Sequence, residues 1–195
     1  MAVKAGTDTI EHMVFHSDES IELIAKAGIS VTPTLLHRTD FAIDLRRDMG
    51  TARFVLEKMK YIQPFCYETF QKMHKAGINI AMGTDMGQEP ESGSNAKELQ
   101  LYVDLGMTPM EAIQTATRNS AIALNRNDLG TIESGKLADI IAVDGDPSVD
   151  VGILAERNNI KMVMKEGEVY VDRRAGKSRS AVQVEHKSWK IIDYV

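Results

Sequence analysis

The stretch Gly77-Ile78-Asn79-Ile80-Ala81-Met82-Gly83-Thr84-Asp85-Met86-Gly87 is a short apolar run that leads into a polar pair. Ile78 to Met82 have the length and composition of a parallel strand that is buried on both faces. Glycines on both sides of Thr84-Asp85 allow backbone turns that a side chain would block. An acid at the end of such a strand is placed for chemistry, although aspartate also caps ordinary turns.

The same signal occurs twice earlier in the chain. Each copy consists of a helix end with lysine, then a glycine, then an apolar strand, which is the pattern of a helix-to-strand connection. The copies span residues 2–12, 25–33 and 74–82. They predict a parallel sheet whose strands end near His12, near Pro33-Thr34 and near Asp85, all on one face.

A long helical pattern covers residues 51–75 and contains Pro64. A proline inside a helix removes one hydrogen bond, so we expect Pro64 to kink or divide this helix. The residues before it, Arg46-Arg47-Asp48, indicate a polar segment. After Asp85, residues 86–94 form a loop of a length suited to a substrate-facing connection between a strand and a helix.

Two helix starts follow the loop. Asn95 with Glu98 has the pattern of an N-cap and its third-position acid, which opens a helix through about Leu105. Thr108-Pro109-Met110-Glu111 is a clearer capping box with proline at the first helical position, and predicts a helix towards Leu124. Helix capping explains these side chains without any functional role.

The periodicity changes after Leu129. Residues 130–143 contain glycine-bounded strands, and residues 144–147 have the composition of a turn. Ile160–Lys165 and 168–171 are separated by Glu166-Gly167 and predict a hairpin with a two-residue turn. We interpret this region as a small β module.

Composition restricts the function. The chain has 195 residues, 43% of them hydrophobic, so it can bury a core for one domain or one and a half. Its net charge of −5 argues against nucleic acid as the main partner, and its apolar runs are too short for a membrane span. The single cysteine, Cys66, fits a reducing, cytoplasmic location and a buried core position. Nucleophile-elbow, phosphate-loop and dinucleotide motifs are absent from the sequence.

His12 and Asp85 are the main candidates for chemistry. Imidazole and carboxylate together suit a divalent transition metal, and an aspartate can also accept a proton from water. Zinc requires at least three protein ligands, and the other histidines do not supply a third convincingly. His16 is either a loop residue or a substrate contact. His37 follows the second strand and is either a solvated loop histidine or part of the same site mouth.

The ordered set of motifs resembles the C-terminal half of the amidohydrolase superfamily, in particular its imidazolonepropionase-like and Xaa-Pro dipeptidase-like branch. The resemblance extends from about Ala5 to Val171. The residues that carry it are Ala5 to His12, Val31 to Leu35, Ala76-Gly77, Gly83 to Asp85, Glu98-Leu99, Gly106 to Ile113, Ala116-Thr117 and Leu129 to Asp139.

This resemblance implies an α/β metal-dependent hydrolase with a TIM-like (β/α) barrel and a small β-sandwich. Residues 1–126 would be a partial barrel with strands 6 to 8 and their helices, 127–172 the C-terminal part of the sandwich, and 173–195 a charged tail. His12 would be a metal ligand, and Asp85 both a metal ligand and the general base. The other metal ligands of the family have no counterpart in this sequence.

Two functions follow from these observations. The first is hydrolysis of a C–N bond in a small amide or dipeptide by a divalent metal, with zinc expected. The second is a catalytically inert half that acts only with a missing N-terminal partner. The helix before Gly6 is too short to be stable alone, so we expect the sequence to begin inside an α/β unit. Unpaired strand edges of a partial barrel would favour self-association.

Overall fold

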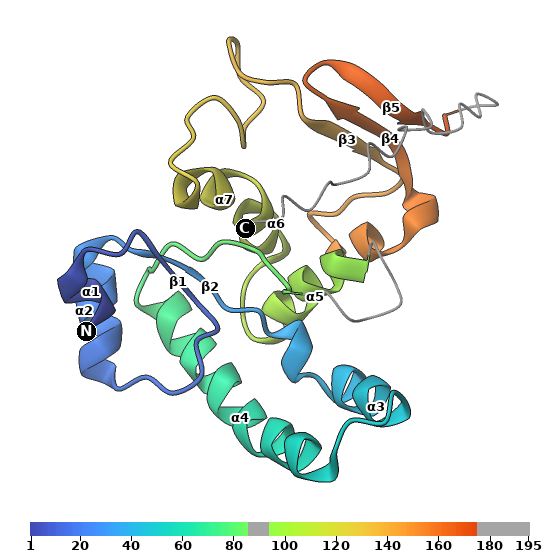
Figure 1. Ribbon diagram of the computed structural model, residues 1–195. Coiled ribbons are helices and arrows are strands. Elements are labelled where there is room, and N and C mark those ends of the chain that lie inside the picture. Colours follow the sequence, from blue (N-terminus) through green and yellow to red (C-terminus); the bar gives the residue numbers. More distant parts are fainter. Residues whose placement is uncertain (86–93, 175–195) are drawn as a thin grey trace, which may run out of the picture.

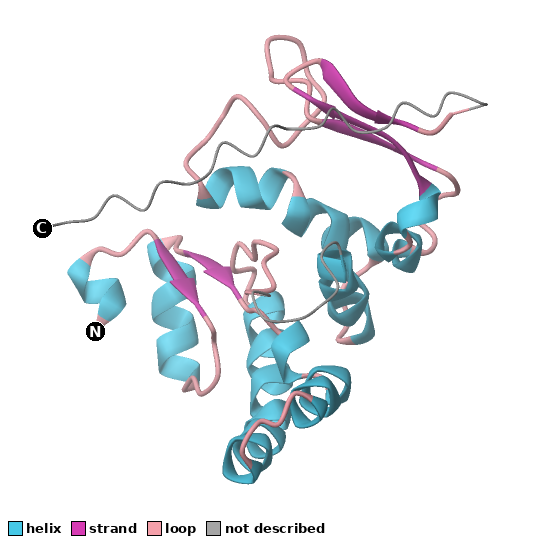
Figure 2. Cartoon of the chain, turned by 45° about the vertical axis from the view of Figure 1, so that its right-hand side comes forward, coloured by secondary structure: helices cyan, strands magenta, loops and turns pink. Residues whose placement is uncertain are grey.

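The computed structural model describes residues 1–85 and 94–174 (Figure 1). The predicted loop at 86–94 and the tail at 173–195 therefore lie almost entirely outside the described residues. Three helices, α5 (Lys97–Asp104), α6 (Pro109–Ala116) and α7 (Arg118–Ala123), lie between a parallel and an antiparallel sheet (Figures 1 and 2).

The parallel sheet forms as the repeated units predict. Strand β1 (Thr9–Glu11) pairs with β2 (Ser30–Thr32) in parallel, with Ile10 opposite Val31. The stretch around Ile80 adds a third, parallel segment through one bridge to Val31. Val31 N–H donates to the Asn79 carbonyl at 2.9 Å, and Ala81 N–H donates to the Val31 carbonyl at 2.8 Å. The central strand therefore has a partner on each side.

Strands β1 and β2 each follow a helix that ends at a left-handed glycine. Helix α1 (Ala2–Ala5) ends at Gly6 with φ 79°, and α2 (Asp18–Ala27) ends at Gly28 with φ 67°. Side chains rarely adopt this conformation, whereas glycine adopts it freely. The predicted helix-to-strand connections are confirmed at both positions.

Helix α4 (Arg53–Lys75) is a single helix of 23 residues that contains Pro64. Pro64 was expected to kink or divide this helix, and it does not divide it. Proline costs an interior helix about 3 kcal/mol, whereas each large apolar side chain buried on the same helix contributes about 1.5–3 kcal/mol. The buried apolar side chains of α4 are Met59, Ile62, Cys66, Phe70 and Met73, so packing of this face outweighs the cost. Cys66 is a buried core residue, as predicted.

One helix was not predicted, and another is shorter than expected. The polar segment at Arg46-Arg47 belongs to helix α3 (Asp40–Asp48), which the Thr39 hydroxyl caps by accepting from Ala42 N–H at 3.2 Å. The single helix expected towards Leu124 is broken at Thr117, where φ is −124° and ψ is −97°. The loop at Gly130 packs against this break, because a Cβ on Gly130 would lie 2.9 Å from the Thr117 carbonyl.

The antiparallel sheet has the order β3 (Ile140–Val143), β4 (Ile160–Lys165) and β5 (Glu168–Asp172). The β4–β5 hairpin is confirmed, and its turn residues Glu166 and Gly167 both have positive φ, as a tight primed turn requires. Residues 130–139 were expected to contain a strand but form turns, with Gly130 and Gly135 in left-handed conformations.

The connections contain four short 3₁₀ helices, which are η1 (Leu36–Arg38), η2 (Ser94–Ala96), η3 (Val151–Ala155) and η4 (Arg157–Asn159). The core lies between the parallel strands, α4 and α5, where Val31, Phe70 and Tyr102 are each fully buried. Within the described ranges, no helix has the length and apolar character needed to cross a membrane.

The capping box at the start of α6 gives a stability prediction. The Thr108 hydroxyl accepts from Glu111 N–H at 3.2 Å, and the Glu111 carboxylate accepts from Thr108 N–H at 2.7 Å. We expect Thr108→Ala to lower the free energy of unfolding by about 1 kcal/mol, measured by urea denaturation. Thr108→Ser keeps the hydroxyl and should remain close to the parent chain. Equal losses in both variants would contradict the assignment.

Candidate functional site

Three residues at the ends of the parallel strands share an uncommon backbone conformation. His12, Thr34 and Asp85 have φ of 58°, 53° and 52°, although none of them is glycine. Left-handed residues of this kind are rare, cost free energy, and cluster at functional sites. All three lie on the face where the sequence predicts the strand ends to meet.

The structure brings His12 and Asp85 together. The Nε2 atom of His12 lies 3.9 Å from Oδ2 of Asp85, and their side chains are 51% and 65% exposed. Thr34 follows the central strand β2 by two residues, so it lies between the other two strand ends in the sheet order. The predicted approach of imidazole and carboxylate is therefore present, with both groups accessible from solvent.

The hydrogen bonds around Thr34 determine which nitrogen of His12 carries the proton. The Thr34 hydroxyl donates its hydrogen to the Pro33 carbonyl at 2.8 Å. It must therefore accept from Nδ1–H of His12, which lies 2.9 Å away. This leaves Nε2 of His12 with a lone pair on the side of Asp85. An imidazole oriented in this way through its other nitrogen is typical of metal-binding histidines.

The donor pair fits one edge of a metal site. Two ligands that are each about 2.1 Å from one ion can lie at most about 4.2 Å apart, and the observed separation of His12 and Asp85 is 3.9 Å. Among the residues that the structure describes, no group of three or more histidine, cysteine, aspartate or glutamate side chains could hold a metal ion. The described part of the chain thus brings together two donor groups of the kind that bind metals.

His37 lies against Asp85 and is only 7% exposed. Of its two interpretations, the solvated loop histidine was wrong, and the structure places it beside Asp85 as the other one expected. Its Nε2 contacts the Asp85 carbonyl oxygen and lies 4.0 Å from Oδ2 of the same residue. Arg46 Nη2 lies 3.4 Å from Nδ1 of His37. Because a guanidinium can only donate, Nδ1 accepts and Nε2 carries the hydrogen that is donated to Asp85.

Comparison with known proteins identifies the family. Residues 1–170 match the model of the Amidohydrolase family. The chain belongs to this family. The curated relatives include ochratoxinase of Aspergillus niger, 31% identical over 173 residues, which cover 87% of this chain and 35% of that protein. Imidazolonepropionase of Desulfotalea psychrophila is 29% identical over 175 residues, covering 86% of this chain and 36% of that protein.

A solved structure described as a Xaa-Pro dipeptidase with bound methionine in the active site matches with a TM-score of 0.77 and 38% identity. The match covers 87% of this chain and 41% of that chain. These neighbours have the amidohydrolase fold, which is of the TIM-barrel type, and the family is hydrolytic. This amidohydrolase chain spans about a third of the length of the curated relatives it matches.

His16, the other residue predicted to contact substrate, makes its contacts on a different side of the chain from His37. Its Nδ1 lies 3.2 Å from the Ser20 hydroxyl at the start of α2, and partial burial lowers its pKa. It lines a surface depression with Phe15, Phe65 and Thr69. The contacts of His16 therefore lie on the α2 and α4 side of the amidohydrolase chain, and not at Asp85.

Glu98 is the site neighbour that the sequence analysis missed. It is completely buried, and its two carboxylate oxygens accept from Leu35 N–H at 2.7 Å and from Leu36 N–H at 2.6 Å. Burial raises the pKa of the Glu98 carboxyl to about 7, and these hydrogen bonds oppose the rise. The prediction that Glu98 caps its own helix was wrong, because Ala96 is the N-cap residue of α5. The sequence did contain one indication of this burial: Glu98 lies four residues before Tyr102, on the buried face of α5.

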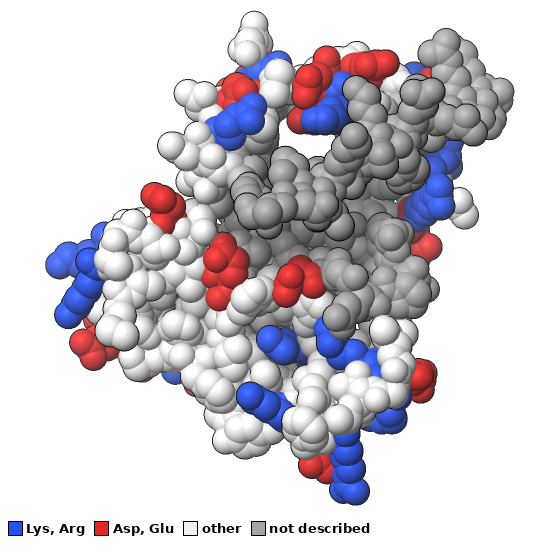
Figure 3. Space-filling model, in the orientation of Figure 1, with Lys and Arg blue, Asp and Glu red and all other residues white. Residues whose placement is uncertain are grey.

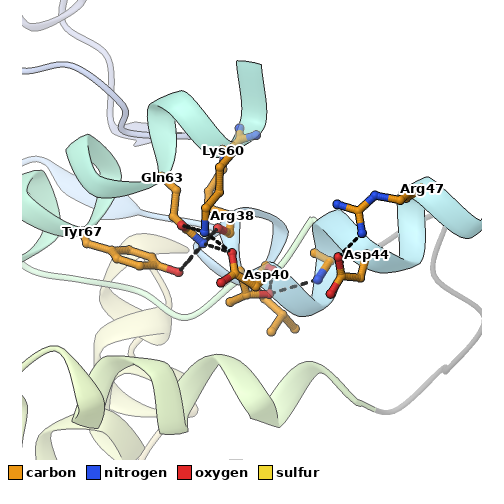
Figure 4. Close-up of polar contacts among 10 residues, drawn as sticks. Arg38, Asp40, Asp44, Arg47, Lys60, Gln63 and Tyr67 are labelled. Atoms are coloured by element: carbon orange, nitrogen blue, oxygen red, sulfur yellow. Dashed lines mark hydrogen bonds and ion pairs between the residues drawn. The ribbon is translucent and has the colours of Figure 1, made fainter. Parts of the chain in front are cut away.

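A polar network anchors the segment that follows His37. Gln63 Nε2 donates to the Arg38 carbonyl at 2.6 Å and to Asp40 Oδ1 at 3.1 Å, and Lys60 Nζ donates to the same Asp40 oxygen at 2.6 Å (Figure 4). The hydroxyl of Tyr67 donates to the Arg38 carbonyl at 3.4 Å. Helix α4 thus holds the end of η1 and the start of α3.

The surface charge is mixed. Among the described residues on the face drawn in Figure 3, side chains of both signs occur, and several lysine and arginine groups lie in its lower part. This distribution agrees with a net charge of −5.

Proposed function

We propose that this chain is the C-terminal part of a metal-dependent amidohydrolase that cleaves a C–N bond in a small amide, with a dipeptide as the substrate class. The observation that carries the proposal is the pairing of His12 Nε2 with the Asp85 carboxylate, 3.9 Å apart at the ends of parallel strands. The name of the Amidohydrolase family supports an amide-type substrate, and the similarity to a Xaa-Pro dipeptidase supports a dipeptide.

In this proposal, His12 and Asp85 hold a divalent metal, and their nitrogen and oxygen donors suit zinc. The ion, when bound, supplies Lewis acidity for the scissile carbonyl and lowers the pKa of water. Asp85 accepts a proton from the attacking water and returns it to the leaving nitrogen. Thr34 holds His12 in the required tautomer, and the exposed faces of His12 and Asp85 admit substrate. The substrate role predicted for His16 and His37 remains a proposal.

The proposed architecture assigns the three parallel segments to barrel strands 6 to 8. Residues 1–126 then form a partial (β/α) barrel and 127–172 the C-terminal part of a small β-sandwich, with a charged tail at 173–195. In the described residues, β1 pairs only with β2, so its other edge is available to a further strand. The matched region is 87% of this chain but only 35% of ochratoxinase, so a relative of this kind has further segments that could supply such a strand.

The competing proposal is that the chain alone is catalytically inert and acts only with an N-terminal partner. It is favoured by the two-donor site, since catalytic zinc sites usually have three protein ligands. The test compares this chain with the product of the reading frame extended upstream of Met1. Both are dialysed against zinc, analysed for bound metal, and assayed with Xaa-Pro dipeptides. We expect stoichiometric zinc and turnover only in the longer protein. Tight zinc and turnover in this chain alone, abolished by Asp85→Asn, would show that its site is complete.

The metal role of His12 gives a separate prediction. We expect His12→Ala to weaken zinc binding by the longer protein at least about tenfold, because one of its few protein ligands is removed. Competition with a chromophoric chelator measures the affinity. His74→Ala is the matched control, since His74 lies in the last turn of α4 and pairs with Glu111 at 3.5 Å. Equal affinity in both variants would remove His12 from the metal site.

A further inference from the structure

The buried carboxylate of Glu98 reaches a distant part of the chain. It lies on α5 and accepts hydrogen bonds from Leu35 and Leu36, residues 63 and 62 positions earlier. Burying a carboxylate is costly, and bonds from two amide groups offset only part of that cost. An apolar residue of similar size would avoid the cost but would leave two buried N–H groups without partners. The carboxylate therefore has a specific task at these two amides.

Those amides belong to the turn that carries His37. Leu35 is the N-cap residue of η1, and His37 is its second residue. On the far side of His37, the Arg38 carbonyl accepts hydrogen bonds from Gln63 and Tyr67. His37 thus lies between two anchors, one supplied by α5 and one by α4.

The contact made by His37 is with the backbone of Asp85. Its Nε2–H donates to the Asp85 carbonyl, and Asp85 has φ of 52°. This conformation costs free energy for any residue except glycine, although least for asparagine and aspartate, so contacts that hold it in place matter. His37 is one of the groups that hold it, so a shift of the η1 turn would change the direction of the Asp85 side chain.

We propose that Glu98 is a positioning residue for the hydrolytic site: its carboxylate fixes the turn at Leu35 and Leu36, and this turn sets His37 against Asp85. The inference rests on the proposed function, because it concerns the residue assigned there as the base. Glu98 does not touch the reacting atoms in this arrangement. It acts through two backbone amides and one imidazole.

The test uses the imidazole of His37 as a reporter in this chain. Long-range ¹H–¹⁵N spectra give the tautomer of His37 and the solvent exchange rate of its Nε2–H. We expect the parent to show the Nε2–H tautomer with slow exchange. In Glu98→Gln, the NH₂ group replaces one carboxylate oxygen and faces the N–H of Leu35 or Leu36. One hydrogen bond is lost, so the turn at Leu35 and Leu36 loosens. We expect exchange at His37 to accelerate at least about tenfold, under conditions where the chain stays folded.

Leu99→Ala is the matched control. Leu99 is the next residue on α5 and is 3% exposed, so its truncation loses packing but keeps both Glu98 hydrogen bonds. We expect His37 exchange in this variant to remain within about twofold of the parent when the folded fractions are matched. The same acceleration in both variants would mean that Glu98 only stabilises the fold, and would overturn the proposal.

If Glu98→Gln does not fold, His37→Gln can be used instead. It tests whether the turn at Leu35 and Leu36 keeps its structure without the His37 imidazole. We expect the Leu35 and Leu36 amides to keep the parent's protection from exchange, while the Asp85 resonances shift. Loss of protection at Leu35 and Leu36 would show that the turn depends on His37, which is the reverse of the proposal. These measurements need neither metal nor turnover, so they distinguish a failure of the positioning role from a failure of the proposed function.

Discussion

Asp85→Asn is expected to lower the turnover of the longer, zinc-loaded protein by at least about 10³-fold, because general acid–base catalysis typically contributes about 10²–10⁴. The asparagine side chain keeps an oxygen that can face the metal but cannot accept the proton from water. Asparagine also adopts left-handed backbone conformations readily. Asparagine therefore fits the φ of 52° at this position without new backbone strain, whereas alanine would introduce strain. Steady-state hydrolysis of Xaa-Pro dipeptides measures the loss.

Zinc content must be measured in the same samples, because a loss of metal would also abolish turnover. Asp44→Asn is the control, since Asp44 is an exposed residue on α3 that pairs with Arg47. We expect its turnover to equal that of the parent. Turnover of Asp85→Asn within about tenfold of the parent, at full zinc occupancy, would exclude Asp85 as the general base.

The parts of the fold that could be predicted are those with local causes. A left-handed glycine after a lysine-containing helix end is specified within a few residues, and it correctly located the connections at Gly6 and Gly28. Once these units were placed in a parallel sheet, geometry alone brought His12 towards Asp85. The capping box at Thr108 was likewise confirmed because all its atoms lie within one turn.

The features that were missed depend on contacts between distant residues. Glu98 matches a helix-capping pattern, but its oxygens bond to amides more than 60 residues away. The sequence left the position of His37 open between solvent and the site mouth, because its partner Asp85 lies 48 residues later. The break at Thr117 is packed against Gly130. Pattern rules consider neighbours along the chain, so they assign such residues to local roles or to solvent.

The largest loss of stability is expected from Phe70→Ala on helix α4. Phe70 is fully buried, and its ring stacks on Tyr102 with centroids 4.8 Å apart. Truncating a buried phenylalanine leaves a cavity and costs about 3–5 kcal/mol. Single domains have a free energy of unfolding of only about 5–15 kcal/mol. We therefore expect a large shift of the urea midpoint, with an unchanged slope.

Phe54→Ala provides a control with the same substitution on the same helix. Phe54 is 73% exposed, so its loss should change the free energy of unfolding by less than about 0.5 kcal/mol. If both variants lost the same free energy, the core between α4 and α5 would not be packed as described. A large loss in Phe70→Ala alone would place the stabilising core at the stack of Phe70 on Tyr102. Tyr102 and Glu98 both lie on α5, so the same helix contributes to this core and, through Glu98, bonds to the turn before His37.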